Sequence, residues 1–307
     1  MLGFNSMNRF LDVQAAKLAK SRYLSAHAFQ YCGAFCGVMC SLFFLLAFVA
    51  AGFVSPIKPW WNAEQTAHHY QTHLTGVRGG AALLVVSGMF YLPFSACISS
   101  QMRRIPNLHY AVHQLQLASA AAGIFTFILP GIILAATSYR PYRNVDITQM
   151  FNDFFWICAL MPWPTFMAQN FAFSYAIILD SRPNPLFPKS LSIVNIVVPS
   201  LFTGALGIHC HKTGATAYNG AMTFWVPGAT FCVQLVVDAY FLWRAIQTEP
   251  EGGEMVVDMF PNKIPNAGLA EKDLESGASN GSGSDEPIHD SAANGTTHEP
   301  AATNGKI

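Results

Sequence analysis

Charged residues are scarce in this chain of 307 residues. Asp, Glu, Lys and Arg make up 11% of it, whereas soluble domains carry roughly a quarter, and hydrophobic residues make up 52%. This composition argues against a soluble globular protein. The segment before residue 248 contains few carboxylates, so any acid chemistry in it must use some of this set: Asp12, Glu64, Asp146, Asp153, Asp180 and Asp238.

The signature motifs of soluble enzymes are also missing. The sequence has no P-loop, no G-x-G-x-x-G and no G-x-S-x-G, and it lacks the aspartate-rich motifs of terpenoid enzymes that ionise a diphosphate. His68, His69 and His73, with His209 and His211, fall short of the histidine boxes of a membrane oxygenase. We therefore expect no cofactor, no metal and no nucleic acid partner.

Long apolar stretches, in contrast, are abundant. A helix needs about 20 apolar residues to cross a bilayer, and six stretches meet or approach this length: 32–54, 79–99, 115–136, 154–179, 191–208 and 221–243. The fold class predicted is an all-α polytopic membrane protein with about six transmembrane helices. Prolines within five of these stretches predict kinked spans and an internal cavity: Pro93, Pro130, Pro162, Pro164, Pro199 and Pro227.

The distribution of charge predicts three regions. Residues 1–31 form a basic N-terminal segment, residues 32–247 a transmembrane helical domain, and residues 248–307 an acidic tail too poor in aromatic residues to order itself. Nine Lys and Arg residues flank the spans on the side of the N-terminus and five on the other side. The positive-inside rule then places both termini in the cytosol, and we expect an integral protein of an internal membrane such as the endoplasmic reticulum.

Asp153 at the start of the fourth span is the first candidate functional residue. Helical spacing places it on one face with an aromatic wall and a deeper amide: Trp156, Leu160, Trp163, Met167 and Asn170. This face is consistent with an acid above a substrate-binding surface. The alternative interpretation is an N-terminal helix cap with an interfacial belt of aromatic residues.

The loop after the first span offers a second carboxylate and a cation. Glu64 lies in this loop, and Arg78 enters the second span on the same side as Asp153. These three groups are candidates to meet at one mouth, where the arginine would hold one carboxylate ionised while desolvation raises the pKa of the other. A solvated loop with a surface ion pair explains the same residues.

Two further aspartates lie near the opposite, cytosolic ends of spans. Asp238 lies inside the sixth span, one turn after Gln234, and carboxylates at membrane depth are functional candidates by default. The alternative for Asp238 is an ion pair with a basic group at the helix end. For Asp180, a structural pair with Arg182 is the favoured interpretation.

Four segments carry a family resemblance. At "AEQTAHHYQTHLTGVRGG", "QMRRI", "DITQMFNDFFWICALMPWPTFMAQN" and "NGAMTFWVP" the chain resembles multi-span proteins of filamentous fungi and actinobacteria, a family that includes the membrane-bound terpene cyclase of the ascofuranone pathway. The resemblance covers roughly residues 55–244. It implies acid-initiated cyclisation of a prenylated aromatic or polyketide precursor in meroterpenoid biosynthesis.

This chemistry assigns roles to the candidate residues. Asp153 or Glu64 would protonate an epoxide or olefin, with Arg78 organising the second carboxylate. Trp156 and Trp163 would shield the cation, because aromatic faces stabilise positive charge, and Asn170 and Asp238 would contact the substrate. The expected partners are membrane lipids, a lipophilic prenylated substrate and an upstream epoxidase or prenyltransferase. The competing hypotheses are an exporter of a small lipophilic metabolite and a membrane scaffold.

Overall fold

The computed structural model describes residues 2–249. The acidic tail predicted for residues 248–307 lies almost entirely outside the described residues. Within 2–249 the regular secondary structure is helical and no strand occurs. The chain is therefore an all-α protein, as predicted.

The helices follow the predicted spans closely but begin and end at different residues. The α-helices run as follows: α1 Leu2–Ala19, α2 Ala26–Ala50, α3 Ala63–Thr72, α4 Leu74–Met102, α5 Tyr110–Gly123, α6 Phe125–Tyr139, α7 Val145–Leu160, α8 Trp163–Leu179, α9 Lys189–Leu201 and α10 Val226–Gln247. Three short elements complete the described chain: η1 Arg22–Leu24, η2 Phe202–Gly207 and η3 Ala221–Trp225.

Five helical segments of the described chain are long and apolar enough to cross a membrane. They are Ala26–Ala50, Leu74–Met102, Tyr110–Tyr139, Lys189–Gly207 and Ala221–Gln247. These correspond to five of the six predicted spans, including the short fifth one, and identify an integral membrane protein. The first of them starts at Ala26, so the predicted N-terminal segment 1–31 contains the first turns of α2 as well as α1.

The predicted fourth span, 154–179, is two helices instead of one, and together they run from α3, against which α7 packs, to the end of the bundle where Arg182 lies beside Arg244. α7 ends at Leu160 and α8 begins at Trp163, with Met161 and Pro162 between them. Pro162 and Pro164 have no N–H to donate, and a proline ring clashes with the carbonyl one turn earlier, so the helix cannot continue. The prediction that Asp153 to Asn170 share one face is therefore wrong beyond Leu160.

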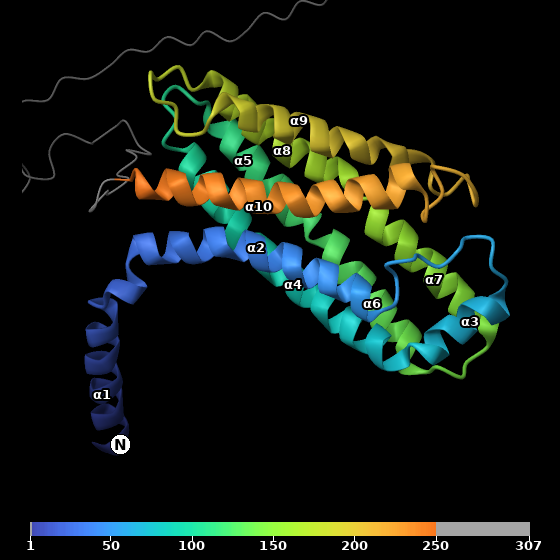
Figure 1. Ribbon diagram of the computed structural model, residues 1–307. Helices are drawn as coiled ribbons and strands as arrows, with labels where there is room; N and C mark the ends of the chain where they lie inside the picture. The colour runs from blue at the N-terminus through green and yellow to red at the C-terminus, as the bar shows by residue number, and fades with distance from the viewer. Residues whose placement is uncertain (1, 250–307) are drawn as a thin grey trace, which may run out of the picture. The chain divides into compact units, whose positions relative to one another are not determined.

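The helices contact one another in an order that differs from the chain order. α2 packs against both α4 and α10, α4 packs against α6, and α9 packs against both α8 and α10. Figure 1 shows α10 in orange beside α2 in blue, with α8 and α9 on the other side of α10. A ring contact of 4.5 Å between Tyr31 and Trp243 fixes the start of α2 beside the end of α10.

Small residues bring α2 and α4 close together. A Cβ atom added at Gly33 would lie 2.2 Å from Cys97 Sγ, and one added at Gly80 would lie 2.6 Å from the Ala47 carbonyl oxygen. Close approach through small residues is how membrane helices gain packing contacts, since lipid already satisfies their apolar surface. This pair of helices forms one wall of the site described next.

Candidate functional site: an aromatic cavity

Four interruptions of regular helix gather around one internal space. They are the turn at Ile124 between α5 and α6, the break between α7 and α8, the 3-10 segment η2 after α9, and the π-helical turn η3 before α10. Continuous helices pack their side chains tightly, whereas a break displaces a turn and leaves room. The sequence prediction of an internal cavity from the prolines agrees with this arrangement.

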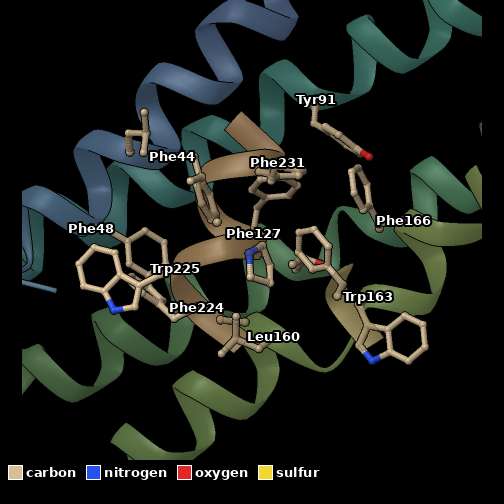
Figure 2. Close-up of a pocket in the computed structure, with 18 of the residues that line it drawn as sticks. Phe44, Phe48, Tyr91, Phe127, Leu160, Trp163, Phe166, Phe224, Trp225 and Phe231 are labelled. Atoms are coloured by element: carbon tan, nitrogen blue, oxygen red, sulfur yellow. The ribbon is translucent and has the colours of Figure 1, made fainter. Parts of the chain in front are cut away.

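The resulting cavity is about 220 Å³ in volume, and aromatic rings dominate its wall. The ring of Phe231 on α10 contacts other lining rings, with centroids 5.1 Å from Phe166 and 5.4 Å from Phe44. Figure 2 shows these rings and their neighbours turned toward a common space. The aromatic lining residues are Phe44, Phe48, Tyr91, Phe127, Trp163, Phe166, Phe202, Phe224, Trp225 and Phe231.

Tyr91 of α4 provides a phenol hydroxyl in this largely apolar wall, to which Thr126 and Thr165 also belong. Its hydroxyl donates a hydrogen bond of 2.5 Å to Gln169 Oε1 of α8, and both side chains are buried. The lining residues contain no carboxylate, amine or imidazole. Sequence reasoning missed Tyr91, because nothing in the second span distinguishes it from an ordinary buried tyrosine.

The cavity opens toward the surface that faces lipid. Val49 of α2 and Trp225 of η3 both line it, and they are 57% and 47% exposed respectively. Apolar side chains exposed on membrane-spanning helices contact lipid tails. The cavity wall is therefore continuous with apolar surface on the outside of the helices.

Asp153, the main predicted acid, belongs to a hydrogen-bond network beside the cavity and does not line it. Asn152 is the centre of this network: it accepts hydrogen bonds of 3.2 Å from the Tyr70 hydroxyl and the Trp156 indole. Its amide donates to Tyr218 Oη and to Asp153 Oδ1, both at 3.3 Å. Asn152 was expected on the same side of the membrane as Asp153 but was not among the predicted site residues.

Asp153 is half-buried and faces a shallow groove that Asp146 and Lys212 also line. It lies just outside the apolar stretch 154–179. Burial raises the pKa of its carboxyl, whereas the hydrogen bond from Asn152 and the charge of Lys212 oppose the rise. Desolvation thus moves Asp153 in the direction that a proton donor requires.

The two predicted tryptophans occupy different positions. Trp163 follows the helix break and lines the cavity. Trp156 is fully buried behind the wall, where it stacks on Tyr218 with centroids 4.9 Å apart and contacts Phe48 and Phe224. Trp156 therefore connects the Asn152 network to two cavity-lining rings.

Glu64 and Arg78 are not brought to Asp153. Glu64 is exposed in the first turn of α3, and Arg78 is exposed and donates to the Ser138 carbonyl oxygen at 3.3 Å. Among residues 2–249, Asp180 and Arg182 form an ion pair at 2.6 Å, as predicted. The expected cluster of Glu64, Arg78 and Asp153 is thus not formed as an ion-paired site.

Asn170 and Asp238 lie together in a second buried cluster, which also contains Asn195 and Gln234. Gln234 Nε2 donates to Asn170 Oδ1 at 2.8 Å and to Asn195 Oδ1 at 2.9 Å, and Asn195 Nδ2 donates to Asp238 Oδ1 at 2.8 Å. Asp238 is therefore held by an amide and not by the basic end group of the alternative prediction. Asn170 also donates to the carbonyl oxygen of Phe166, a cavity-lining residue.

The histidines of the α3 loop have structural partners. His69 and His73 stack with ring centroids 4.4 Å apart, and a ring nitrogen of His69 lies 3.2 Å from the Ala51 carbonyl oxygen. Burial lowers the pKa of His69, which favours its neutral form. No group of three metal-ligating side chains occurs among the described residues.

Fold and cavity together define the class: an integral all-α membrane protein that encloses an aromatic cavity between interrupted helices. Comparisons with protein-family models, with curated proteins and with solved structures find no match to this chain. A function can therefore be argued only from the site itself.

Proposed function

We propose that the chain is a membrane-bound terpene cyclase that converts a prenylated aromatic or polyketide precursor by acid-initiated ring closure, in the membrane of the endoplasmic reticulum with both termini in the cytosol. The observation that carries this proposal is the aromatic cavity and its opening toward lipid. A prenyl chain is apolar and partitions into the bilayer. The ring faces lining the cavity would each stabilise a carbocation by about 0.5–2 kcal/mol.

The reaction balances without a cofactor. A carboxylic acid transfers its proton to the epoxide oxygen or the terminal alkene, and the epoxide C–O bond or the alkene π bond breaks to leave a tertiary cation. An internal double bond then attacks this cation. Loss of a proton, or capture by a substrate hydroxyl with loss of its proton, returns one proton to the protein, so the product is an isomer of the substrate.

Asp153 is the acid we propose for this step, and its place in the Asn152 network supports the choice over Glu64. Trp156 joins that network to Phe48 and Phe224 in the cavity wall. The proposal requires the reacting end of the substrate to pass these two rings and reach Asp153. Tyr91, whose hydroxyl oxygen keeps acceptor capacity beside Gln169, would orient a substrate hydroxyl at the other end of the cavity.

Product analysis by mass spectrometry tests the proposal. Microsomes from a host expressing the full chain are supplied with an epoxidised farnesyl phenol, and a new isomer of unchanged mass is expected. Asp153→Asn should abolish this isomer because an amide cannot donate the proton, while Glu64→Gln, which changes an exposed loop residue, should retain it. Full activity of Asp153→Asn would remove Asp153 from the proposal, and no product from several prenylated substrates with folded protein would contradict the enzyme itself.

Export of a small lipophilic metabolite is the second candidate, and the cluster around Asp238 favours it. A buried carboxylate held by amides from neighbouring helices is typical of proton-coupled transport. In this case Asp238→Asn would reduce efflux of the metabolite from cells, and no cyclised product would form in microsomes. Loss of the isomer in Asp153→Asn with unchanged efflux would instead support the cyclase.

A further inference from the structure

A cleft of about 660 Å³ lies at the end of the bundle where α10 ends, far along the helices from the residues that line the aromatic cavity. Three arginines from separate segments line it: Arg104 after α4, Arg182 in the α8–α9 loop, and Arg244 in the last turn of α10. Leu186 and Phe241 supply apolar wall beside them. Guanidinium groups next to apolar surface match a ligand that has an anionic head and an apolar body.

The guanidinium of Arg104 is already positioned by the protein. Its Nη1 donates to Gln101 Oε1 at 2.5 Å and to the Ala245 carbonyl oxygen at 2.7 Å, and its Nη2 donates to the Thr248 carbonyl oxygen at 3.1 Å. These bonds connect the end of α4 to the end of α10. They use four of its five N–H groups, counting the bond to Thr248 Oγ1, and leave Nε for a ligand.

The other two arginines keep more donors available. Asp180 occupies Nε and Nη2 of Arg182, at 2.7 and 2.6 Å, so Nη1 makes no hydrogen bond to the described residues. Arg244 is exposed and has no hydrogen-bond or ion-pair partner among residues 2–249. Burial lowers the pKa of Arg104, the charge of Glu249 opposes this, and the charge of Arg182 adds a smaller lowering, as expected for cations that share a cleft.

Among residues 2–249, the two carboxylates nearby already have hydrogen-bond partners. Asp180 is paired with Arg182, and Glu249 Oε2 accepts hydrogen bonds from Gln30 and Gln101 at 2.9 and 3.0 Å. Lys189, another cation in this region, donates to the carbonyl oxygens that end α8. The N–H groups of Arg182 and Arg244 that have no protein acceptor could therefore bind an anion with several acceptor oxygens.

We propose that this cleft binds the phosphate of an anionic phospholipid. The cleft lies among helix ends, where lipid headgroups are found, and basic pockets between membrane helices bind such headgroups. The phosphate would lie on Arg182 Nη1 and Arg244, and the glycerol and acyl region on Phe241 and Leu186. This site is separate from the aromatic cavity and does not depend on the proposed cyclase activity.

The test compares two arginines at the same end of the bundle in purified full-length protein. Arg244→Gln removes a cleft cation, whereas Arg103→Gln, the matched control, removes an equal charge from a residue that does not line the cleft. Retention of phosphatidic acid is measured by native mass spectrometry after reconstitution with phosphatidylcholine and phosphatidic acid. We expect Arg244→Gln to weaken retention about fivefold, the effect of one arginine at a headgroup, and Arg103→Gln to leave it unchanged.

Two further arms complete the experiment. Thermal unfolding of both variants should match the parent, because neither side chain has a hydrogen-bond partner among the described residues. Inorganic phosphate and glycerol 3-phosphate should compete only weakly, since they lack the apolar part. Equal loss of lipid in the two variants would overturn the proposal in favour of nonspecific attraction, and tight phosphate binding without lipid retention would overturn the lipid assignment.

Discussion

The aromatic cavity and the amide–carboxylate cluster both use residues of α8 and α10 but are built in opposite ways. The cavity forms where α7, α8 and α10 are interrupted, and its wall is almost entirely apolar. The cluster of Asn170, Asn195, Gln234 and Asp238 lies within continuous helix and is fully buried. Helix breaks thus leave space for a ligand, whereas continuous helices keep buried polar side chains hydrogen-bonded to one another.

The largest expected effect comes from breaking the cluster. Asn195→Leu removes the donor to Asp238 and the acceptor of Gln234 together, leaving both groups buried without that partner. We expect the free energy of unfolding to fall by about 1–3 kcal/mol, measured as a lower unfolding midpoint in detergent. Ile196→Leu on the exposed side of the same helix should leave the midpoint unchanged, and an equal drop in both variants would contradict the special role of the cluster.

Filling the cavity should affect binding more than stability. A Cβ atom added at Gly123 would lie 3.4 Å from Thr165 Oγ1 and 3.8 Å from Tyr91 Cε1, ordinary contacts at the cavity wall. Gly123→Leu should therefore occupy cavity volume and weaken binding of a fluorescent farnesyl ligand by about tenfold, or roughly 1.4 kcal/mol.

Gly79→Leu is the matched control for this change, since a Cβ atom there meets no atom within 4 Å. It should bind the ligand like the parent protein. Parental binding by Gly123→Leu as well would show that the ligand does not occupy this cavity.

A smaller effect is expected in the pH dependence, which should differ between protein stability and ligand binding by the cavity. The guanidinium of Arg182 lowers the pKa of Asp180 to about 2 in the folded protein, compared with about 3.9 in an unfolded chain. A lowered folded pKa stabilises the protein above pH 4, and this stabilisation is lost as the pH falls from about 4 toward 2. The unfolding midpoint should drop in that window, and Asp180→Asn should lose part of the drop.

Ligand binding should not follow the same pH profile. The residues that line the cavity contain no carboxylate or imidazole, so affinity for an apolar ligand is expected to stay constant between about pH 8 and about pH 4. A change in affinity that tracks protonation of a carboxylate would place an acid inside the cavity, contrary to the structure.

The sequence was sufficient to predict the spans but not the cavity wall. Hydropathy depends on local composition, so α2, α4 and α10 were found within a few residues. The shared face from Asp153 to Asn170 failed because Pro162 interrupts the helical period on which the prediction relied. Phe231 and Tyr91 belong to helices far apart in the chain, and only the packing of those helices brings them to one space.

For the candidate polar residues too, the sequence predicted neighbours on one helix but not partners on another helix. Periodicity correctly grouped Asp238 with Gln234, since both lie on α10 one turn apart. Their partner Asn195 comes from another helix, and its contact with them depends on how α9 packs against α10. Arg78 was expected to meet a carboxylate, but the end of α6 places the Ser138 carbonyl within its reach instead.

Photolabelling with a farnesyl probe that carries a diazirine tests whether the aromatic cavity takes up a prenyl chain from the bilayer. After irradiation in membranes, peptides carrying the probe are identified by mass spectrometry. We expect adducts in the segments 160–166 and 224–231, competed by an excess of unlabelled prenylated phenol and reduced in Gly123→Leu. Adducts confined to lipid-facing residues such as Ile193 and Val233, without competition, would contradict it.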